Sequence, residues 1–553
     1  MEKLKPKLFS VMKTYTKEQF VKDVISGIIV AIIALPLSIA LAIASNVPPQ
    51  MGIYTAIFGG FIISFLGGSR VQIAGPTAAF ATIIAGIVAE HDFDGLFYAT
   101  IIAGILLIIM GLCRMGSLIK YIPYTITTGF TAGIAVTIAV GQIKDFLGLT
   151  YPDGTAPAIE TFDKLKVAFE NIATFQWQAL LVGAVSLIIL IVLPKFLPKV
   201  PASLVAVLVS IAIVQIFKLD NVNTIKKAFD LSREVPHLTL QPFSFMKIKA
   251  IIPDAFTIAI LAAIESLLSC VVADSMVNSK HRSNMELIAQ GAGNIVSALF
   301  GGIPATGAIA RTAANIKNGG RTPIAGMVHS IVLLLVLVLL MPAANYIPMP
   351  TIAAILIMVA YNMSGWKAIV KLLKSAPKSD IFVLLVTFVL TVVFDLVVAI
   401  EVGMILTCIL FMKRMSDVTN VESWKYIEDD NDSENDVDSI DLREVPKNTL
   451  VYELSGPLFF GAADKILGIT IDKEHNCVIL RMRSVNAIDA TAMRNLEIIL
   501  ERCKKEGLTL ILSHVNEQPM KAIKKSGFYD LVGEENICPH IDDALHRAAQ
   551  LMK

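Results

Sequence analysis

Long apolar runs alternate with short polar breaks between about residue 23 and residue 412. A helix needs about 20 apolar residues to cross a bilayer. The pattern predicts twelve complete spans, at residues 24–45, 52–67, 95–112, 124–147, 177–193, 201–217, 254–273, 286–301, 322–341, 347–362, 380–396 and 398–412. Two further segments, at 76–89 and 306–316, begin at Gly/Pro breaks and are too short to cross alone. We therefore expect a polytopic α-helical membrane domain of fourteen elements over residues 23–414.

Basic residues predict the orientation, because cytoplasmic loops carry an excess of Lys and Arg. Six lysines lie within residues 1–22, a segment that we place in the cytoplasm. Alternation then puts almost every basic loop on that side, whereas the acidic stretch 90–94 falls outside. Residues 366–374 alternate apolar and Lys positions at helical spacing, which predicts an interfacial helix. We expect a multi-pass protein of the cytoplasmic membrane with both termini inside.

The chain changes character after residue 414. Residues 428–441 are dominated by Asp and Glu and predict a solvated linker within 415–445. Strand-type apolar runs at 449–454, 477–482 and 508–512 then alternate with helical patterns. Those patterns cover 461–471, 489–505, 517–526 and 541–551. Such alternation predicts a small cytoplasmic α/β domain over residues 446–553.

Composition excludes several classes of protein. Hydrophobic residues make up 55% of the 553-residue chain, charged residues 17%, and the mean hydropathy is +0.68. Soluble chains carry about 25% charged residues, so this is not a cytosolic enzyme, a disordered scaffold or a secreted disulfide protein. The net charge of +1 gives no sign of a nucleic-acid partner. The sequence has no phosphate-binding GxxxxGK[ST] loop, nucleophile–base pair or metal-ligand spacing. We expect a non-enzyme without a cofactor, driven by gradients or exchange.

The two short segments, opening at 73–80 and 301–312, carry the mechanistic signal, because each is the third element of its half. Short Gly/Pro-interrupted segments at matching positions are typical of inverted-repeat transporters. A helix that begins in mid-membrane has unpaired N–H groups and a positive dipole end, which together favour an anion. Small residues let the substrate approach the backbone: Gly75, Ala78, Gly307 and Ala308. The alternative is that Gly-Pro only starts an ordinary helix, but the pairing favours the site.

Charges inside the spans are functional candidates because they are costly there. Glu265 lies in mid-span, with Ser269 one turn later on the same face. A carboxylate beside an anion would repel it unless it bound a cation or a proton, which is the logic of a coupling-ion site. A purely structural carboxylate is the alternative. Arg311, one turn into the second short helix, would add positive potential or serve as a cytoplasmic-end anchor.

These residues resemble the SulP family of anion transporters, also called solute carrier family 26. The similar motifs lie at 35–54, 67–77 and 301–323. The C-terminal domain is similar to STAS domains at 459–463 and 488–491. The resemblance implies a seven-plus-seven inverted repeat with core and gate domains, elevator-type alternating access and a homodimer. It also implies a STAS domain able to bind a regulatory protein or nucleotide.

The resemblance implies a site for each ligand. The anion would lie against Leu37, Leu41, Thr77, Ala78, Gly307, Ala308 and Arg311. The coupling ion, Na⁺ or H⁺, would lie at Glu265 and Ser269, with Gly307 and Ile309. Thr491 sits where anti-sigma antagonists of the STAS fold are phosphorylated, although a helix-start residue beside a capping Asp489 is the favoured interpretation.

Some residues depart from the common family pattern. Leu37 and Leu41 replace a more usual Gln and aromatic residue, a feature shared with sodium-dependent bicarbonate transporters of cyanobacteria. Those proteins have Asp and Thr where this chain has Glu265 and Ser269, and Glu often accompanies proton coupling or exchange. Na⁺ and H⁺ therefore both stay open.

We expect a secondary active transporter of a small inorganic oxyanion, bicarbonate or sulfate. The alternatives are an uncoupled exchanger or channel of the same fold, a C4-dicarboxylate transporter, or an anion sensor that signals through the STAS domain.

Overall fold

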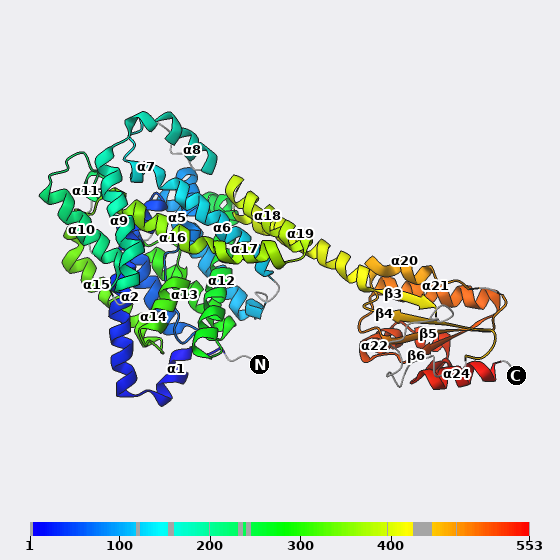
Figure 1. Cartoon of the computed structure of the whole chain (residues 1–553). Helices are drawn as coiled ribbons and strands as arrows, with labels where there is room; N and C mark the ends of the chain where they lie inside the picture. The colour runs from blue at the N-terminus through cyan, green and yellow to red at the C-terminus, as the bar shows by residue number, and fades with distance from the viewer. Residues whose placement is uncertain are drawn as a thin grey trace. The chain divides into compact units, whose positions relative to one another are not determined.

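A computed structural model describes residues 4–117, 122–152, 160–197, 200–229, 236–238, 245–394, 396–423, 445–471 and 473–551. The chain forms two compact units, Met1–Met404 and Ile405–Lys553 (Figure 1). The first unit is helical, and the second contains the main sheet. The whole acidic run 428–441 lies outside the described residues, within the gap 424–444, whereas the first part of the predicted linker 415–445 is described and contains the end of a helix, to Val418, and a strand, Asn420–Ser423.

Every apolar run predicted as a span is helical. In chain order the helices are α1 (Lys7–Val11), α2 (Lys17–Ala44), α3 (Pro49–Tyr54), α4 (Gly60–Leu66), α5 (Ala81–Leu112), α6 (Tyr124–Gly141), α7 (Ile143–Leu147), α8 (Thr161–Glu170), α9 (Trp177–Phe196), α10 (Ala202–Ile216), α11 (Ile225–Ala228), α12 (Phe245–Val277), α13 (Ser283–Leu299), α14 (Ile309–Lys317), α15 (Ile324–Ala344), α16 (Met349–Ser364), α17 (Trp366–Ser375), α18 (Lys378–Val393) and α19 (Leu396–Val418). Seven described helical stretches are long and apolar enough to cross a membrane, and α10 and most of α15 are shorter apolar helices.

Short helical turns complete the unit: η1 (Met12–Thr14), η2 (Thr55–Gly59), η3 (Ala78–Phe80) and η5 (Ile172–Thr174). The η2 turn is π-helical and joins α3 to α4 without a break. The sequence pattern did not predict α1, α8 or α11, which are short or amphipathic and lie outside the long apolar runs.

One break in α5 separates the predicted short segment 76–89 from the predicted span 95–112. Asp92 has φ 59° and ψ −170°, far from helical values, at the acidic stretch predicted as an outer loop. Asp tolerates positive φ better than most residues. The short segment 76–89 and the span 95–112 therefore share one element label but are two helices on either side of Asp92.

Close helix packing in this unit depends on small residues. Gly104 of α5 and Gly291 of α13 face each other: a Cβ on Gly104 would lie 2.7 Å from the Gly291 carbonyl oxygen, and one on Gly291 would lie 2.4 Å from that of Gly104. Without a hydrophobic driving force in lipid, such contacts let helix backbones pack closely.

The C-terminal unit is built on a five-stranded sheet in the order β3-β4-β5-β6-β7. The strands are β3 (Asn420–Ser423), β4 (Thr449–Ser455), β5 (Cys477–Ser484), β6 (Thr509–Ser513) and β7 (Ile537–Cys538). β3 pairs antiparallel with β4, and the remaining pairs are parallel.

Helices pack on the sheet of this unit, and the apolar core has one cluster on each face. They are α20 (Ala463–Leu467), α21 (Ala490–Glu506), α22 (Glu517–Lys525), α23 (Phe528–Val532) and α24 (Ile541–Gln550), with the turns η9 (Phe460–Ala462) and η10 (Glu534–Asn536). The predicted strands and helices are present. The pattern missed β3, β7 and α23, which have only four, two and five residues.

Candidate functional site

The two short helices begin beside one two-residue ladder. β1 (Ala74–Gly75) pairs antiparallel with β2 (Thr306–Gly307), with Ala74 opposite Gly307 and Gly75 opposite Thr306. The ladder is extended by a hydrogen bond from the Ala308 N–H to the Ile73 carbonyl oxygen, 2.8 Å long. The chain leaves β1 into η3 and α5, and it leaves β2 into α14. Segments more than 200 residues apart are thereby fixed together.

Neither short helix has a side-chain cap at its start. Thr77, before η3, has φ −127° and ψ 157°, and Ala308, before α14, has φ −93° and ψ 106°. Both residues are extended, and neither side chain accepts a hydrogen bond from the first turn. The first N–H groups of a helix need partners, so these backbones can donate to an anion.

Glu265 of α12 contacts the start of the first short helix. The Thr77 hydroxyl donates to Glu265 Oε2 over 2.9 Å. The next residue, Ser266, contacts the second short helix: its Oγ accepts from the Gly307 N–H at 3.1 Å and lies 2.7 Å from Thr306 Oγ1. Two consecutive residues of α12 thus join both short segments. Sequence reasoning missed Ser266 and Thr306, although Ser266 directly follows the carboxylate it singled out.

Arg311 of α14 supplies the positive charge. The side chain is 1% exposed, and its Nη2 donates to the Pro76 carbonyl oxygen at 3.1 Å and to Ser38 Oγ at 3.4 Å. Its Nε and Nη1 are buried without a hydrogen-bond partner in the described part of the chain. The guanidinium therefore lies against the start of the other short helix, with two donors available. A buried charge without partners is costly, and an anion would compensate it.

The remaining predicted substrate residues are less uniform. Leu41 and Ala78 are buried, and Leu37 is half-buried. Ala308 is 9% exposed at the start of α14, whereas Ile309 is 46% exposed. Because the Ile309 side chain is apolar, only its backbone groups could contact an ion.

Ser269 carries an oxygen that fits a cation. It lies one helical turn from Glu265, is 1% exposed, and its Oγ has no hydrogen-bond partner in the described ranges. Hard cations prefer oxygen ligands, so the Glu265 carboxylate and this hydroxyl fit a bound ion. Within the residues that the structure describes, no three His, Cys, Asp or Glu side chains group as metal ligands.

A second buried carboxylate, Glu286 of α13, is structural. Its two oxygens accept from the N–H groups of Gly68 and Ser69, at 2.8 and 3.1 Å, and from the amides of Gln72 and Gln290, each at 2.9 Å. Four donors satisfy the charge without any ion. The sequence reasoning did not single out Glu286. The signal that could have identified it is its position as the first residue of the predicted span 286–301, where a charged residue is uncommon.

Gln72 links the Glu286 carboxylate to the ladder. Its Nε2 is held by Glu286, and its Oε1 accepts from the Cys270 thiol at 2.6 Å. A Cβ on Gly307 would lie 2.2 Å from Gln72 Nε2. The amide therefore occupies the space that a side chain at residue 307 would need, and it sets the position of the second short segment.

The STAS-like domain has its own polar features. Asp489 caps α21, since its Oδ1 accepts from the Ala492 N–H at 2.8 Å and its Oδ2 accepts from the Phe460 N–H at 3.0 Å. Thr491 is exposed in the first turn of that helix. This geometry agrees with the helix-start interpretation of Thr491.

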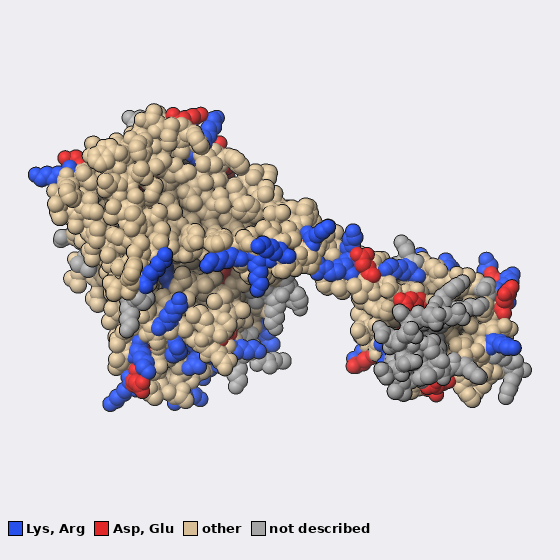
Figure 2. Space-filling view, viewed as in Figure 1, with Lys and Arg blue, Asp and Glu red and all other residues tan. Residues whose placement is uncertain are grey.

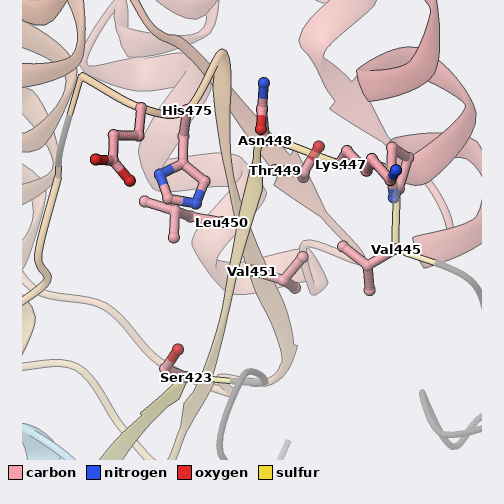
Figure 3. A pocket seen from close by; sticks show the side chains of 10 residues that line it. Ser423, Val445, Lys447, Asn448, Thr449, Leu450, Val451 and His475 are labelled. Atoms are coloured by element: carbon pink, nitrogen blue, oxygen red, sulfur yellow. The ribbon is translucent and has the colours of Figure 1, made fainter.

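A cavity of about 460 Å³ lies at the edge of the C-terminal sheet. Ser423 at the end of β3, Thr449 and Leu450 at the start of β4, and His475 before β5 line it (Figure 3). Residues 424–444 separate Ser423 from Val445 and lie outside the described residues. For that reason we assign no ligand to this cavity.

These features define a multi-pass membrane transporter with paired half-helices, joined to an α/β domain. The chain belongs to the sulfate permease family, whose sequence model matches residues 20–387, and a STAS domain model matches residues 439–544. Because this is a family of transporters, we conclude that the chain is a transporter and not an enzyme.

The relatives extend over nearly the whole chain. A putative sulfate transporter of Bacillus subtilis, YvdB, is 38% identical over 96% of this chain and 98% of its own. The bicarbonate transporter BicA of Picosynechococcus is 29% identical over 95% and 94%. Among solved structures, murine solute carrier 26 member A9 in an inward-facing state matches with a TM-score of 0.86 at 19% identity, covering 99% of this chain and 94% of that one. The BicA transmembrane domain matches with a TM-score of 0.62 at 26% identity, covering 71% and 98%.

Proposed function

We propose that the protein is a secondary active transporter of a small inorganic oxyanion, bicarbonate or sulfate. The observation that carries the proposal is the β1–β2 ladder, which places two uncapped helix starts beside one buried guanidinium. The relatives named for sulfate and bicarbonate transport support this class of substrate.

In this proposal the anion binds to backbone N–H groups of the two short helices and to the free donors of Arg311. A site built from N–H groups and a fork of guanidinium donors suits a planar or tetrahedral oxyanion. The small side chains of Ala78 and Ala308 let the anion reach the backbone. Glu265 provides the opposing charge that excludes the anion until a cation compensates it.

We propose that Glu265 and Ser269 hold the coupling cation, Na⁺ or H⁺. The carboxylate is connected to the first short helix through Thr77, so its state of charge or occupancy is felt where the anion binds. A cation at Glu265 would lower the repulsion there and raise the affinity for the anion, and the anion would raise the affinity for the cation by the same factor.

The packing supports an elevator-type movement. α5, α12 and α13 pack together, and α16 and α18 both pack on α6. Between these two groups lies a cavity of about 400 Å³, lined among others by Thr82 of α5, Asp254 of α12, Thr137 of α6 and Thr391 of α18. We propose that the first group carries the anion past the second during transport.

Uptake into proteoliposomes tests the function. Labelled sulfate and bicarbonate are offered separately under an imposed Na⁺ gradient, an imposed proton gradient, or neither. We expect gradient-dependent uptake of one of these anions. If neither gradient increases uptake of either anion, the proposed coupled transport is wrong; current without a countergradient would instead identify a channel.

Glu265→Gln tests the coupling. The variant keeps the size of the side chain and a hydrogen-bonding oxygen but removes the charge, so we expect gradient-driven uptake to fall to the rate without a gradient. Glu401→Gln is the matched control, since Glu401 is an exposed carboxylate of α19. Coupled uptake that survives Glu265→Gln would make the carboxylate structural.

Orientation and assembly complete the proposal. Figure 2 shows a broad uncharged face on the transmembrane unit, with Lys and Arg gathered near α1, the start of α2 and α17. We propose that this basic side faces the cytoplasm, with both termini inside the cell, and protease access in inside-out vesicles tests this orientation.

We also propose that the protein is a homodimer, which native mass spectrometry tests. We propose finally that the STAS domain binds a regulatory protein or nucleotide, which a pull-down with the full-length protein tests.

A further inference from the structure

A polar cavity of about 290 Å³ lies between the N-terminal segment and the transmembrane unit, apart from the ladder. Two arginines line it, Arg70 after α4 and Arg321 before α15. Thr14, Tyr15, Thr16 and Gln19 line it from the N-terminal segment. All of its lining residues are described, and none of them is acidic.

Arg70 has donor capacity that nothing in the described ranges uses. Its Nε is buried without a hydrogen-bond partner. Arg70 as a whole is half-buried and lines the cavity, and an oxyanion is the partner whose geometry matches a guanidinium fork. Arg321 is held in place through its Nη1, which donates to the carbonyl oxygens of Ile316 and Gly320 at 2.7 and 2.8 Å.

One carboxylate, Asp23, is hydrogen-bonded to residues that line this cavity. Asp23 of α2 is buried and accepts from the Tyr15 hydroxyl at 3.0 Å, the Gln19 amide at 2.9 Å, the Arg321 N–H at 2.8 Å and the Thr322 hydroxyl. These neutral donors stabilise the carboxylate, whose single negative charge is opposed by the two guanidinium groups that line the cavity. Burial, followed by the charge of Asp23, raises the pKa of Tyr15 to about 12, so this hydroxyl stays protonated and adds no negative charge.

Other cations lie close by. The Lys7 ammonium donates to the Lys280 carbonyl oxygen at 2.8 Å, and Arg282 holds the N-terminal segment through the Lys5 carbonyl oxygen and Ser10. Burial lowers the pKa of Lys7, the guanidinium groups of Arg282 and Arg70 lower it further, and the Asp274 carboxylate raises it. The four basic side chains Lys7, Arg70, Arg282 and Arg321 outnumber the two carboxylates Asp23 and Asp274, so the surroundings of the cavity favour negative charge.

We propose that this cavity is a second anion site, which binds a free inorganic oxyanion such as phosphate between Arg70 and Arg321. Thr16 Oγ1 accepts from the Gln19 N–H at 3.2 Å, so its hydroxyl hydrogen is available for the anion. The bound anion connects the N-terminal segment to the transmembrane unit, and it holds residues 11–19 in place. The site shares no residue with the ladder, so an anion bound there would not compete with one bound at the ladder.

Protection from trypsin tests the site without relying on transport. Lys13 and Lys17 are exposed trypsin sites within the N-terminal segment. The full-length protein is placed in discs of phosphatidylcholine, and cleavage after these lysines is followed by mass spectrometry as inorganic phosphate is added. At a phosphate concentration ten times Kd, we expect cleavage to slow about tenfold, because the ligand reduces the open population by that factor.

Variants separate this site from the ladder. Arg70→Gln should abolish protection, Arg70→Lys should keep part of it, and Lys374→Gln, an exposed charge-matched control on α17, should keep all of it. Protection should persist in Arg311→Met, since the anion at the ladder is not involved. The melting temperature of each variant shows that it is folded.

Three results would overturn the proposal. Phosphate could fail to slow cleavage of the wild type, or Arg70→Gln and Arg70→Lys could both be protected like the wild type. Alternatively, discs containing phosphatidic acid could protect without added phosphate while free phosphate does not, in which case the occupant is a lipid headgroup.

Discussion

The two short helices begin at the same ladder, yet they bring opposite chemistry to it. The first begins at Gly75-Pro76-Thr77, carries no charge and reaches the Glu265 carboxylate through Thr77. The second begins at Ala308 and carries Arg311, which reaches back to the first through the Pro76 carbonyl oxygen. Both helix starts therefore present similar backbone N–H groups. Their side-chain surroundings differ, because the first start contacts the negative Glu265 carboxylate and the second carries the positive Arg311 guanidinium.

In the mechanism that we propose, this division would let the site couple two ions. The anion would be attracted by one short helix and its guanidinium, and the cation by the carboxylate next to the other. Because the ladder fixes both starts, each ion would change the electrostatic field at the other ion. Substitutions on the Arg311 side should therefore change the affinity for the anion, whereas substitutions on the Glu265 side should change the dependence of transport on the coupling ion.

The largest effect is expected for Arg311→Met, which removes the charge of the second helix but keeps an unbranched apolar chain. A hydrogen bond to a charged group contributes about 1.5–3 kcal/mol, and each 1.4 kcal/mol is about a tenfold change in affinity. We expect the KM for the transported anion to rise on the order of 10- to 100-fold. Uptake measured against anion concentration gives this value.

Arg311→Lys is the control for charge, and it should recover part of the affinity without the fork geometry. The melting temperature must be compared, because Arg311 also donates to the Pro76 carbonyl oxygen. A normal KM in the Met variant would show that Arg311 only holds the two helices together.

A smaller effect is expected from adding one methyl group to either side of the ladder. A Cβ at Gly75 would lie 2.3 Å from Arg311 Nη1, and a Cβ at Gly307 would lie 2.2 Å from Gln72 Nε2. Gly75→Ala should displace a free donor and weaken anion binding about tenfold, the effect of one charged hydrogen bond. Gly307→Ala should displace an amide that Glu286 and Cys270 hold, and so lower the melting temperature more.

Gly141→Ala is the matched control, since a Cβ there meets nothing within 4 Å. Transport assays and thermal melting of the three variants compare the two sides directly. If Gly75→Ala lowered stability as much as Gly307→Ala with an unchanged KM, the guanidinium would not be poised for the anion.

Much of this arrangement could be predicted from the sequence, because it depends on the length of the apolar runs and on the few charged residues within them. Apolar length gave the spans, and the Gly/Pro breaks gave the two short helices. Glu265 and Arg311 were identifiable because charges within spans are costly. The position of Glu265 at the ladder and its bond to Thr77 are what the structure adds.

The missing parts depend on contacts between distant segments. Ser266 and Thr306 are ordinary polar residues until α12 and β2 meet, and their 2.7 Å contact leaves no local pattern. Gln72 and Glu286 are 214 positions apart, so only the fold shows that one carboxylate is satisfied by four donors. The same reasoning separates Glu286 from Glu265, which the sequence presents as similar acids.

The smallest effect is expected for Ser269→Ala, and it tests the cation half of the comparison. The Ser269 hydroxyl is buried without a partner in the described chain, so its removal loses no protein hydrogen bond. Ser64 of α4 is a matched control, because its Oγ is likewise buried and unpartnered. Both alanine variants should melt at or slightly above the wild-type temperature. Only Ser269→Ala should raise the half-saturating concentration of the coupling ion, by a few-fold, about what one neutral ligand contributes. If both variants shift the ion dependence equally, or neither does, Ser269 is not a ligand and the cation is held by Glu265 without it.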